Sequence, residues 1–103
     1  MYNKQIEYYF NILRSIEKKK ISSQRDLAQQ LGFSIGKINY CIKALKKKGL
    51  VKISNFNSSK KKRSYAYIIT LKGLKEKSRL TIEFMKKKSQ EYEELKKDLE
   101  NQI

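Results

Sequence analysis

The sequence predicts a mainly helical α+β fold, with three short helices, a β-hairpin and then one long helix. Three observations lead to this prediction. Two short helical segments carry their own capping residues and are separated by a turn that contains glycine. Two β-prone runs enclose a polar, basic loop. The last thirty residues contain no proline and no glycine, so we expect a single uninterrupted helix there.

The first helix is predicted from apolar residues at helical spacing. One stripe is expected to face the core, and it consists of Ile6, Tyr9, Phe10, Leu13 and Ile16. Tyr8 and Ile12 add a second apolar edge. That is more than a lone surface helix needs, so we expect a partner to cover this edge. The lysines at 18–20 end the helix favourably, since cations complement the negative C-terminal end of a helix.

The second helix is short and has a stop signal at each end. Ser23 is the expected N-cap, with Asp26 in the place of the usual Glu or Gln of a capping box. Gly32 ends the helix because it readily adopts the left-handed conformation. The expected buried face is Leu27, Ala28 and Leu31.

The third helix begins at its own cap, Ser34, and closes at Gly49 after three lysines. One side is apolar and is formed by Ile35, Ile38, Ile42 and Leu45. Cys41 lies towards that side and is expected to be a small core residue rather than a redox sensor. Two short capped helices joined by a tight turn form a helix-turn-helix pattern.

A β-hairpin is predicted directly after the third helix. Residues 50–53 and 65–70 have strand character, and the loop between them is rich in Asn, Ser and Lys. The run 60–63 places four cations near the end of this loop. A basic hairpin in this position is the wing of a winged helix-turn-helix. Residues 1–73 are therefore expected to form one DNA-binding domain.

A long helix is expected to begin at Leu71, with Thr70 as its N-cap. Its residues 74–103 are expected to serve for dimerisation. Leu74, Leu80 and Phe84 are expected to pack on the domain body. Thirty helical residues extend about 45 Å, which is too long to bury on so small a domain. The outer half is therefore expected to meet a second copy of the chain. The expected dimerisation residues are Met85, Tyr92, Leu95 and Leu99, although Thr81 and Lys88 interrupt this heptad seam.

The charge of the chain points to a polyanionic partner. Lys and Arg number 25 against 10 Asp and Glu, a net charge of +15. Of this excess, +14 lies before residue 74. No apolar run approaches the ~20 residues that span a bilayer, so nucleic acid is favoured over a membrane.

Histidine is absent and Cys41 is the one cysteine, which excludes Cys/His zinc sites and the usual nucleophile–base pairs. We therefore expect no enzyme activity, no metal and no cofactor, and a reducing, cytoplasmic (nucleoid-associated) location.

Several residues are expected to contact double-stranded DNA. A helix-turn-helix places the N-terminal part of its second helix in the major groove. Asn39 suits bidentate recognition of adenine, Lys43 can reach guanine, and Tyr40 can contact thymine methyl groups. The starts of both helices suit phosphates, and the wing cations suit the backbone or the minor groove. The full set is Ser23, Gln24, Ser34, Gly36, Lys37, Asn39, Tyr40, Lys43, Lys47, Lys60, Lys61, Lys62 and Arg63.

Several short segments carry a family resemblance. The segments 22–28, 31–32, 34–41 and 45–49 resemble the MarR-type winged-helix regulators associated with exopolysaccharide biosynthesis operons, and the match extends to Tyr65–Tyr67, Thr70–Gly73 and Tyr92-Glu93. The resemblance runs from about Tyr8 to Glu100 and is most distinctive at 36–41. It implies a prokaryotic regulator of a polysaccharide gene cluster, either activator or repressor. Full-length MarR proteins have longer termini, so the resemblance does not extend to an effector pocket between them.

Other interpretations of the same residues remain open. The lysines at 18–20 and 46–48 could serve only as charge complements at helix C-termini. The run at 60–63 could be a solvated loop. For the chain as a whole, the alternatives are a winged-helix module that binds proteins and a non-specific nucleic-acid-binding protein.

Overall fold

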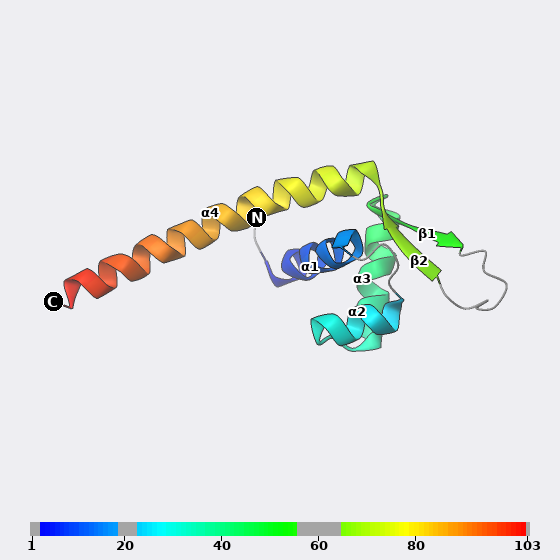
Figure 1. The fold of residues 1–103 in the computed structure, drawn as a ribbon, viewed down its shortest axis with the longest axis horizontal. Coiled ribbons are helices and arrows are strands. Elements are labelled where there is room, and N and C mark those ends of the chain that lie inside the picture. The colour runs from blue at the N-terminus through cyan, green and yellow to red at the C-terminus, as the bar shows by residue number, and fades with distance from the viewer. Residues whose placement is uncertain (1–2, 19–22, 56–64, 103) are drawn as a thin grey trace.

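The computed structural model describes residues 3–18, 23–55 and 65–102, and it has the predicted order of elements (Figure 1). Three helices come first: α1 (Lys4–Lys18), α2 (Gln24–Leu31) and α3 (Ile35–Lys47). The strands β1 (Val51–Asn55) and β2 (Tyr65–Ile69) follow, and α4 (Leu71–Asn101) completes the chain. The fold is a winged helix-turn-helix with a long C-terminal helix, as predicted.

The predicted helix signals act where the sequence places them. Ser23, Ser34 and Thr70 are the N-caps of α2, α3 and α4, and each side-chain oxygen accepts a hydrogen bond from the backbone three residues on. Gly32 and Gly49 have φ values of 69° and 75°, a left-handed conformation that costs a glycine little. These local signals therefore fix both ends of the helix-turn-helix.

The strands β1 and β2 form a two-stranded antiparallel sheet in which Val51 pairs with Ile69 and Ile53 with Tyr67. Val51 and Tyr67 point into the core, whereas Ile53 and Ile68 are more than one-third exposed. A two-stranded sheet is marginal on its own, so its buried face must pack on the helices. Figure 1 shows the hairpin projecting from one end of the helical body.

The helix α1 lies at the centre of the domain and contacts α2, α3, α4 and β2. The core gathers around it, and its fully buried members are Ile12, Leu13, Ile16, Leu27, Ile38, Ile42, Leu45 and Cys41. Each large apolar side chain buried in this way contributes roughly 1.5–3 kcal/mol.

Two predictions about burial are wrong. Ile12 was expected to need a partner, yet it is fully buried in the chain's own core, because α1 is covered on several sides. Ile35 was expected to be buried, yet it is 51% exposed. Ile35 is the first residue of α3, and the periodicity of a helix gives the direction of a side chain but not whether a neighbour lies there.

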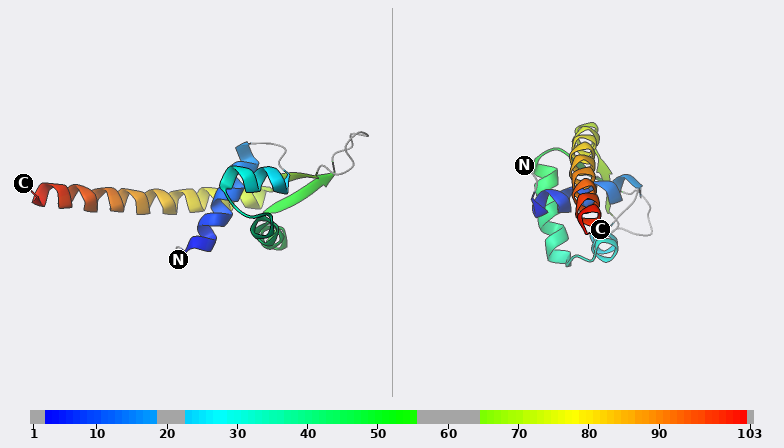
Figure 2. Two further views of the ribbon diagram at one scale, coloured as in Figure 1. Left: turned by 90° about the horizontal axis from the view of Figure 1, so that it is seen from below. Right: turned by 90° about the vertical axis from the view of Figure 1, so that its left-hand side faces the viewer.

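The long helix α4 runs along the body and then leaves it (Figure 2). The molecule measures 65 × 26 × 20 Å, and α4 lies along the long dimension with the β1–β2 hairpin extending beyond its start (Figure 1). Near its start, Leu80 is buried and the rings of Phe84 and Phe10 stack 4.6 Å apart, as expected for side chains that pack on the body. Met85, Tyr92, Leu95 and Leu99 are each 63–67% exposed.

Candidate nucleic-acid interface

One side of α3 is covered by the core and the other is open. Ile38, Cys41, Ile42 and Leu45 are buried. The side chains predicted to face away from them, Tyr40, Lys43 and Lys47, are exposed, as is Gly36. Tyr40 is 63% exposed. The open side of α3 thus carries two cations, one aromatic ring and one glycine.

A hydrogen bond joins α2 to α3 beside this open side. The Gln24 side-chain amide donates to Oδ1 of Asn39 over 3.1 Å, and both side chains are partly buried. The sequence predicts Gln24 as a phosphate contact and Asn39 as a base contact, but it does not predict that they touch. They are fifteen residues apart, so only the packing of α2 against α3 brings them together.

Lys37 occupies a different position from the other predicted DNA contacts. Its ammonium lies 3.5 Å from the ring centroid of Tyr8 and 4.5 Å from that of Phe33. These two rings are themselves in edge contact, with centroids 5.0 Å apart. The cation is attracted by the negative ring faces, so the Lys37 side chain extends towards α1. The helical spacing does not predict this cluster, although Tyr8, on the second apolar edge of α1, was the residue that could have indicated it.

The two serines predicted as phosphate contacts are occupied as caps. Oγ of Ser23 accepts from the backbone N–H of Asp26, and Oγ of Ser34 accepts from that of Lys37, each over 3.1 Å. A serine hydroxyl that accepts one hydrogen bond can still donate its own proton. Both hydroxyls can therefore still donate a hydrogen bond to a phosphate oxygen.

Thr70 fixes the hairpin relative to α3 and α4. Its hydroxyl donates to the carbonyl of Gly49 over 2.7 Å and accepts from the backbone N–H of Gly73 over 3.0 Å, while its own N–H donates to Leu50. One residue thus joins the end of α3, the base of the hairpin and the start of α4. The predicted wing contacts Lys60, Lys61, Lys62 and Arg63 lie outside the described residues.

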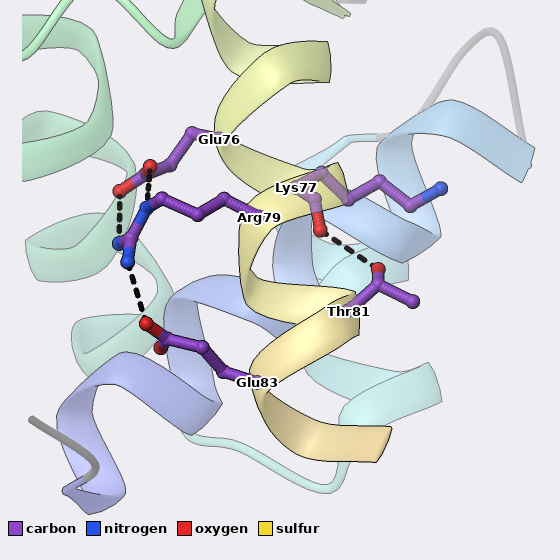
Figure 3. A network of polar contacts seen from close by, with 5 residues as sticks. All are labelled: Glu76, Lys77, Arg79, Thr81 and Glu83. Atoms are coloured by element: carbon purple, nitrogen blue, oxygen red, sulfur yellow. Dashed lines mark hydrogen bonds and ion pairs between the residues drawn. The ribbon is translucent and has the colours of Figure 1, made fainter. Parts of the chain in front are cut away.

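Ion pairs join successive turns in the first half of α4 (Figure 3). The Arg79 guanidinium donates to both carboxylate oxygens of Glu76, over 2.7 and 3.0 Å, and to Glu83 over 2.8 Å. Hydrogen bonding from Arg79 holds the pKa of the Glu76 carboxyl below its usual value. Lys77 pairs with Glu17 at the end of α1, so α4 is also tied to the body.

The described residues offer little else in the way of reactive chemistry. No cluster of three or more His, Cys, Asp or Glu among them could hold a metal ion. Burial raises the pKa of the Cys41 thiol, which makes its nucleophilic thiolate scarcer at neutral pH. No helix in the described ranges is long and apolar enough to cross a membrane.

Comparisons with known proteins agree with this geometry. Residues 10–52 match the family model described as winged helix-turn-helix DNA-binding. That stretch holds most of α1, all of α2 and α3, and the start of β1. No curated protein is significantly similar to the chain in sequence.

Several solved structures share the fold. The chain resembles the transcriptional regulator PcaV of Streptomyces coelicolor, with 18% identity, a TM-score of 0.69, and 77% of this chain and 57% of that one covered. It resembles ZitR of Lactococcus lactis, a zinc-responsive MarR family member, with 23% identity, a TM-score of 0.68, and coverage of 85% and 58%. FabT of Streptococcus pneumoniae, in complex with DNA, matches with 19% identity, a TM-score of 0.63, and coverage of 81% and 56%.

The chain spans a little over half the length of these three structures. Their identities of 18–23% show a shared fold. The chain is thus a winged helix-turn-helix protein with the fold of these transcriptional regulators.

Proposed function

We propose that the chain is a transcriptional regulator that binds specific sequences in duplex DNA as a homodimer. The observation that carries this proposal is the open side of α3, where Tyr40, Lys43 and Lys47 are exposed. The opposite side is packed on the core through Ile38, Cys41, Ile42 and Leu45. An exposed helix with cations and polar side chains suits the major groove, whose base edges carry a distinct donor and acceptor pattern. The FabT structure in complex with DNA and the matching family model support this proposal.

Within this proposal, the residues divide into two classes. Asn39, Tyr40 and Lys43 would contact base edges, and Gly36 would let the backbone approach them. The helix starts at Ser23, Gln24, Ser34 and Lys37, together with Lys47 and the wing cations Lys60, Lys61, Lys62 and Arg63, would contact the sugar-phosphate backbone. Contacts of the second class set affinity, and those of the first class set sequence preference.

The regulated genes are proposed on the sequence resemblance alone. The run Gly36–Cys41 lies on α3, which is the element that would recognise bases. Its likeness to the exopolysaccharide-associated regulators supports an operator near a polysaccharide biosynthesis operon. A regulator of transcription would act in the cytoplasm, at the nucleoid, and this location is part of the proposal.

A salt titration tests the proposal. Phosphate contacts release counterions, so the affinity of the full chain for a random-sequence duplex should fall steeply between 50 and 200 mM salt, by roughly 10³-fold for six contacts. Lys61→Ala should weaken binding to all sequences and lower the slope by about one unit. An affinity that does not change with salt would favour a protein-binding module, and a preference for single strands would favour non-specific RNA binding.

A further inference from the structure

A basic pocket of about 450 Å³ lies where the end of α3, the base of the hairpin and the start of α4 meet. Its lining consists of Lys48, Leu50, Lys72, Lys75, Glu76 and Arg79. Four cations thus face one carboxylate, an excess of three positive charges beside one apolar side chain. A pocket of this volume is large enough for a small organic molecule.

The Arg79 side chain does not account for this excess of charge. Its guanidinium donates to both carboxylate oxygens of Glu76 and to Glu83, so it is paired within its own helix (Figure 3). These ion pairs also engage Glu76, the one carboxylate of the pocket. The excess charge therefore belongs to the three lysines.

The three lysines gather around the pocket from two segments of the chain. Lys48 and Lys72 lie close enough to the Glu76 carboxyl for their charges to lower its pKa. The stem of Lys72 also crosses Gly49, where an added Cβ would lie 3.9 Å from it. Among the residues that the structure describes, no salt bridge involves Lys48, Lys72 or Lys75. The pocket thus brings together three ammonium groups whose charge no described carboxylate pairs with directly.

The lysines on α4 lie at the end of the helix that disfavours cations. Lys72 and Lys75 are among its first five residues, which include no acidic side chain. The N-terminal end of a helix carries a partial positive charge, so the two ammonium groups are destabilising there and an anion is stabilising. An anion in the pocket would offset both this effect and the mutual repulsion of the lysines.

The pocket is also distant from the part of α3 that would meet the major groove. That part is the N-terminal half, which follows the cap Ser34. Lys48 caps the opposite end of the helix, about 20 Å further along its axis. The contacts proposed for base edges therefore do not explain this group of cations.

We propose that the pocket binds a small phosphate monoester, with Lys48, Lys72 and Lys75 around its phosphate group and Leu50 against its organic part. This inference goes beyond the proposed function, because the ligand is a small molecule and its binding does not require DNA. A phosphate monoester carries about two negative charges at pH 7 and has three strong acceptor oxygens. Lysine binds phosphate as a point charge, so three ammonium groups suit such a dianion.

Titration calorimetry of the full chain with phenyl phosphate tests the proposal at low ionic strength, where screening is weak. Phenyl phosphate should bind more tightly than inorganic phosphate, which has no organic part to contact Leu50. Benzenesulfonate has the same ring and a single charge, so it should bind roughly fivefold more weakly. Equal binding of phenyl phosphate and benzenesulfonate would overturn the assignment to a phosphate group.

The pH dependence of binding distinguishes a dianion from a monoanion. Lowering the pH from about 7.5 to about 5.5 should weaken the binding of phenyl phosphate, because its phosphate takes up a proton near pH 6. The lysines keep their charge over this range, and so does Glu76, whose pKa lies below its usual value. Binding of phenyl phosphate that did not change with pH would contradict recognition of the dianion.

A charge-neutralising double variant locates the ligand. Lys72→Gln with Lys75→Gln should weaken phenyl phosphate binding roughly tenfold, because two charge-assisted hydrogen bonds are lost. Lys86→Gln with Lys96→Gln removes the same charge from exposed positions further along α4 and should leave the affinity unchanged. In spectra of the ¹⁵N-labelled wild type, the ligand should shift the amide resonances of residues 48–50 and 71–76. Equal weakening by the two double variants, or shifts confined to other residues, would overturn the pocket as the site.

Two further measurements separate this ligand from misfolding and from DNA contacts. Without ligand, the Lys72→Gln, Lys75→Gln chain should melt no lower than the wild type, because it removes cations from the positive end of α4. Phenyl phosphate should then raise the Tm of the wild type alone. The same variant should leave the salt dependence of duplex binding unchanged. A slope lower by about two units would assign the pocket to the DNA backbone, which would overturn the small-molecule ligand and leave the proposed regulator intact.

Discussion

The side-chain amide of Gln24 donates a hydrogen bond to Oδ1 of Asn39 over 3.1 Å, and so joins the first residue of α2 to the middle of α3. This bond restricts the side-chain torsion angles of Asn39. The Asn39 oxygen retains a second lone pair, and its NH₂ group can still donate. Asn39, which is expected to recognise adenine, is therefore held in place by Gln24, which is expected to contact the DNA backbone.

Removing this bond should relax sequence preference. In Gln24→Ala, Asn39 loses the partner that orients it, and such a bond contributes about 0.5–1.5 kcal/mol. Discrimination at one base position should therefore fall roughly threefold to tenfold, as measured by competition with duplexes that differ at single positions. Gln29→Ala, on the exposed side of α2, is the control and should leave preference unchanged. A uniform loss of affinity without loss of preference would show that Gln24 acts only on phosphate.

Because α4 begins close to the base of the hairpin, any side chain at position 73 should destabilise the fold. A Cβ at Gly73 would lie 2.2 Å from the carbonyl oxygen of Leu50 and 2.7 Å from Ile69, so the first turn of α4 would have to move. Gly73→Ala should lower the free energy of unfolding by roughly 1–3 kcal/mol in urea titrations.

Gly36→Ala provides the contrast on the open side of α3. No atom lies within 4 Å of a Cβ there, and the residue is helical with no positive φ. This variant should be as stable as the wild type or more stable by up to about 1 kcal/mol. Its added methyl group should nonetheless weaken duplex binding if the backbone approaches DNA. Equal stability of the Gly73 and Gly36 variants would contradict the packing described here.

The Glu76–Arg79 ion pair should make stability depend on pH. Because the pKa of Glu76 is lowered in the folded chain, its stabilising effect is present above the unfolded value of about 4.3 and is lost as the pH falls through the lower folded value. Glu76→Gln should therefore lower Tm by about 1–4 °C at pH 7. At a pH below both the unfolded and the folded pKa of Glu76 the two melting curves should coincide, and a difference that persisted there would assign the effect to packing instead.

Cys41 should be inert in the folded protein. Its side chain is only 2% exposed and burial raises the pKa of its thiol, so both access and thiolate are limited. Iodoacetamide at pH 7 should leave the native chain unmodified and should alkylate it fully in urea, as followed by mass spectrometry. The exposed cysteine of an Asn101→Cys chain should react without urea. Rapid alkylation of native Cys41 would show that α3 is not packed on the core.

Local signals explain why most of the fold could be predicted. A serine or threonine that caps a helix and a glycine that ends one act through neighbours within a few residues, and this is why Ser23, Ser34, Thr70, Gly32 and Gly49 are found in their predicted roles. The helical period likewise gave the open and buried sides of α3.

The features that the sequence did not predict are contacts between distant segments. Neither the Gln24–Asn39 bond nor the position of Lys37 over Tyr8 follows from spacing within one helix, because both depend on how helices pack. Ile12 was expected at an uncovered edge because its helix was considered alone, although four elements surround it. Sequence patterns thus identify the elements that would meet DNA better than the way their side chains are held.

Selection of bound duplexes from a random pool tests the central claim most directly. A homodimer that reads bases through the open side of α3 should enrich a palindrome with half-sites about one helical turn apart. In that pool, Asn39→Ala should lose preference at one position in each half-site, at a cost of about 1–3 kcal/mol in discrimination. A pool that shows no enriched sequence after repeated rounds, although the chain binds duplex, would contradict sequence-specific regulation.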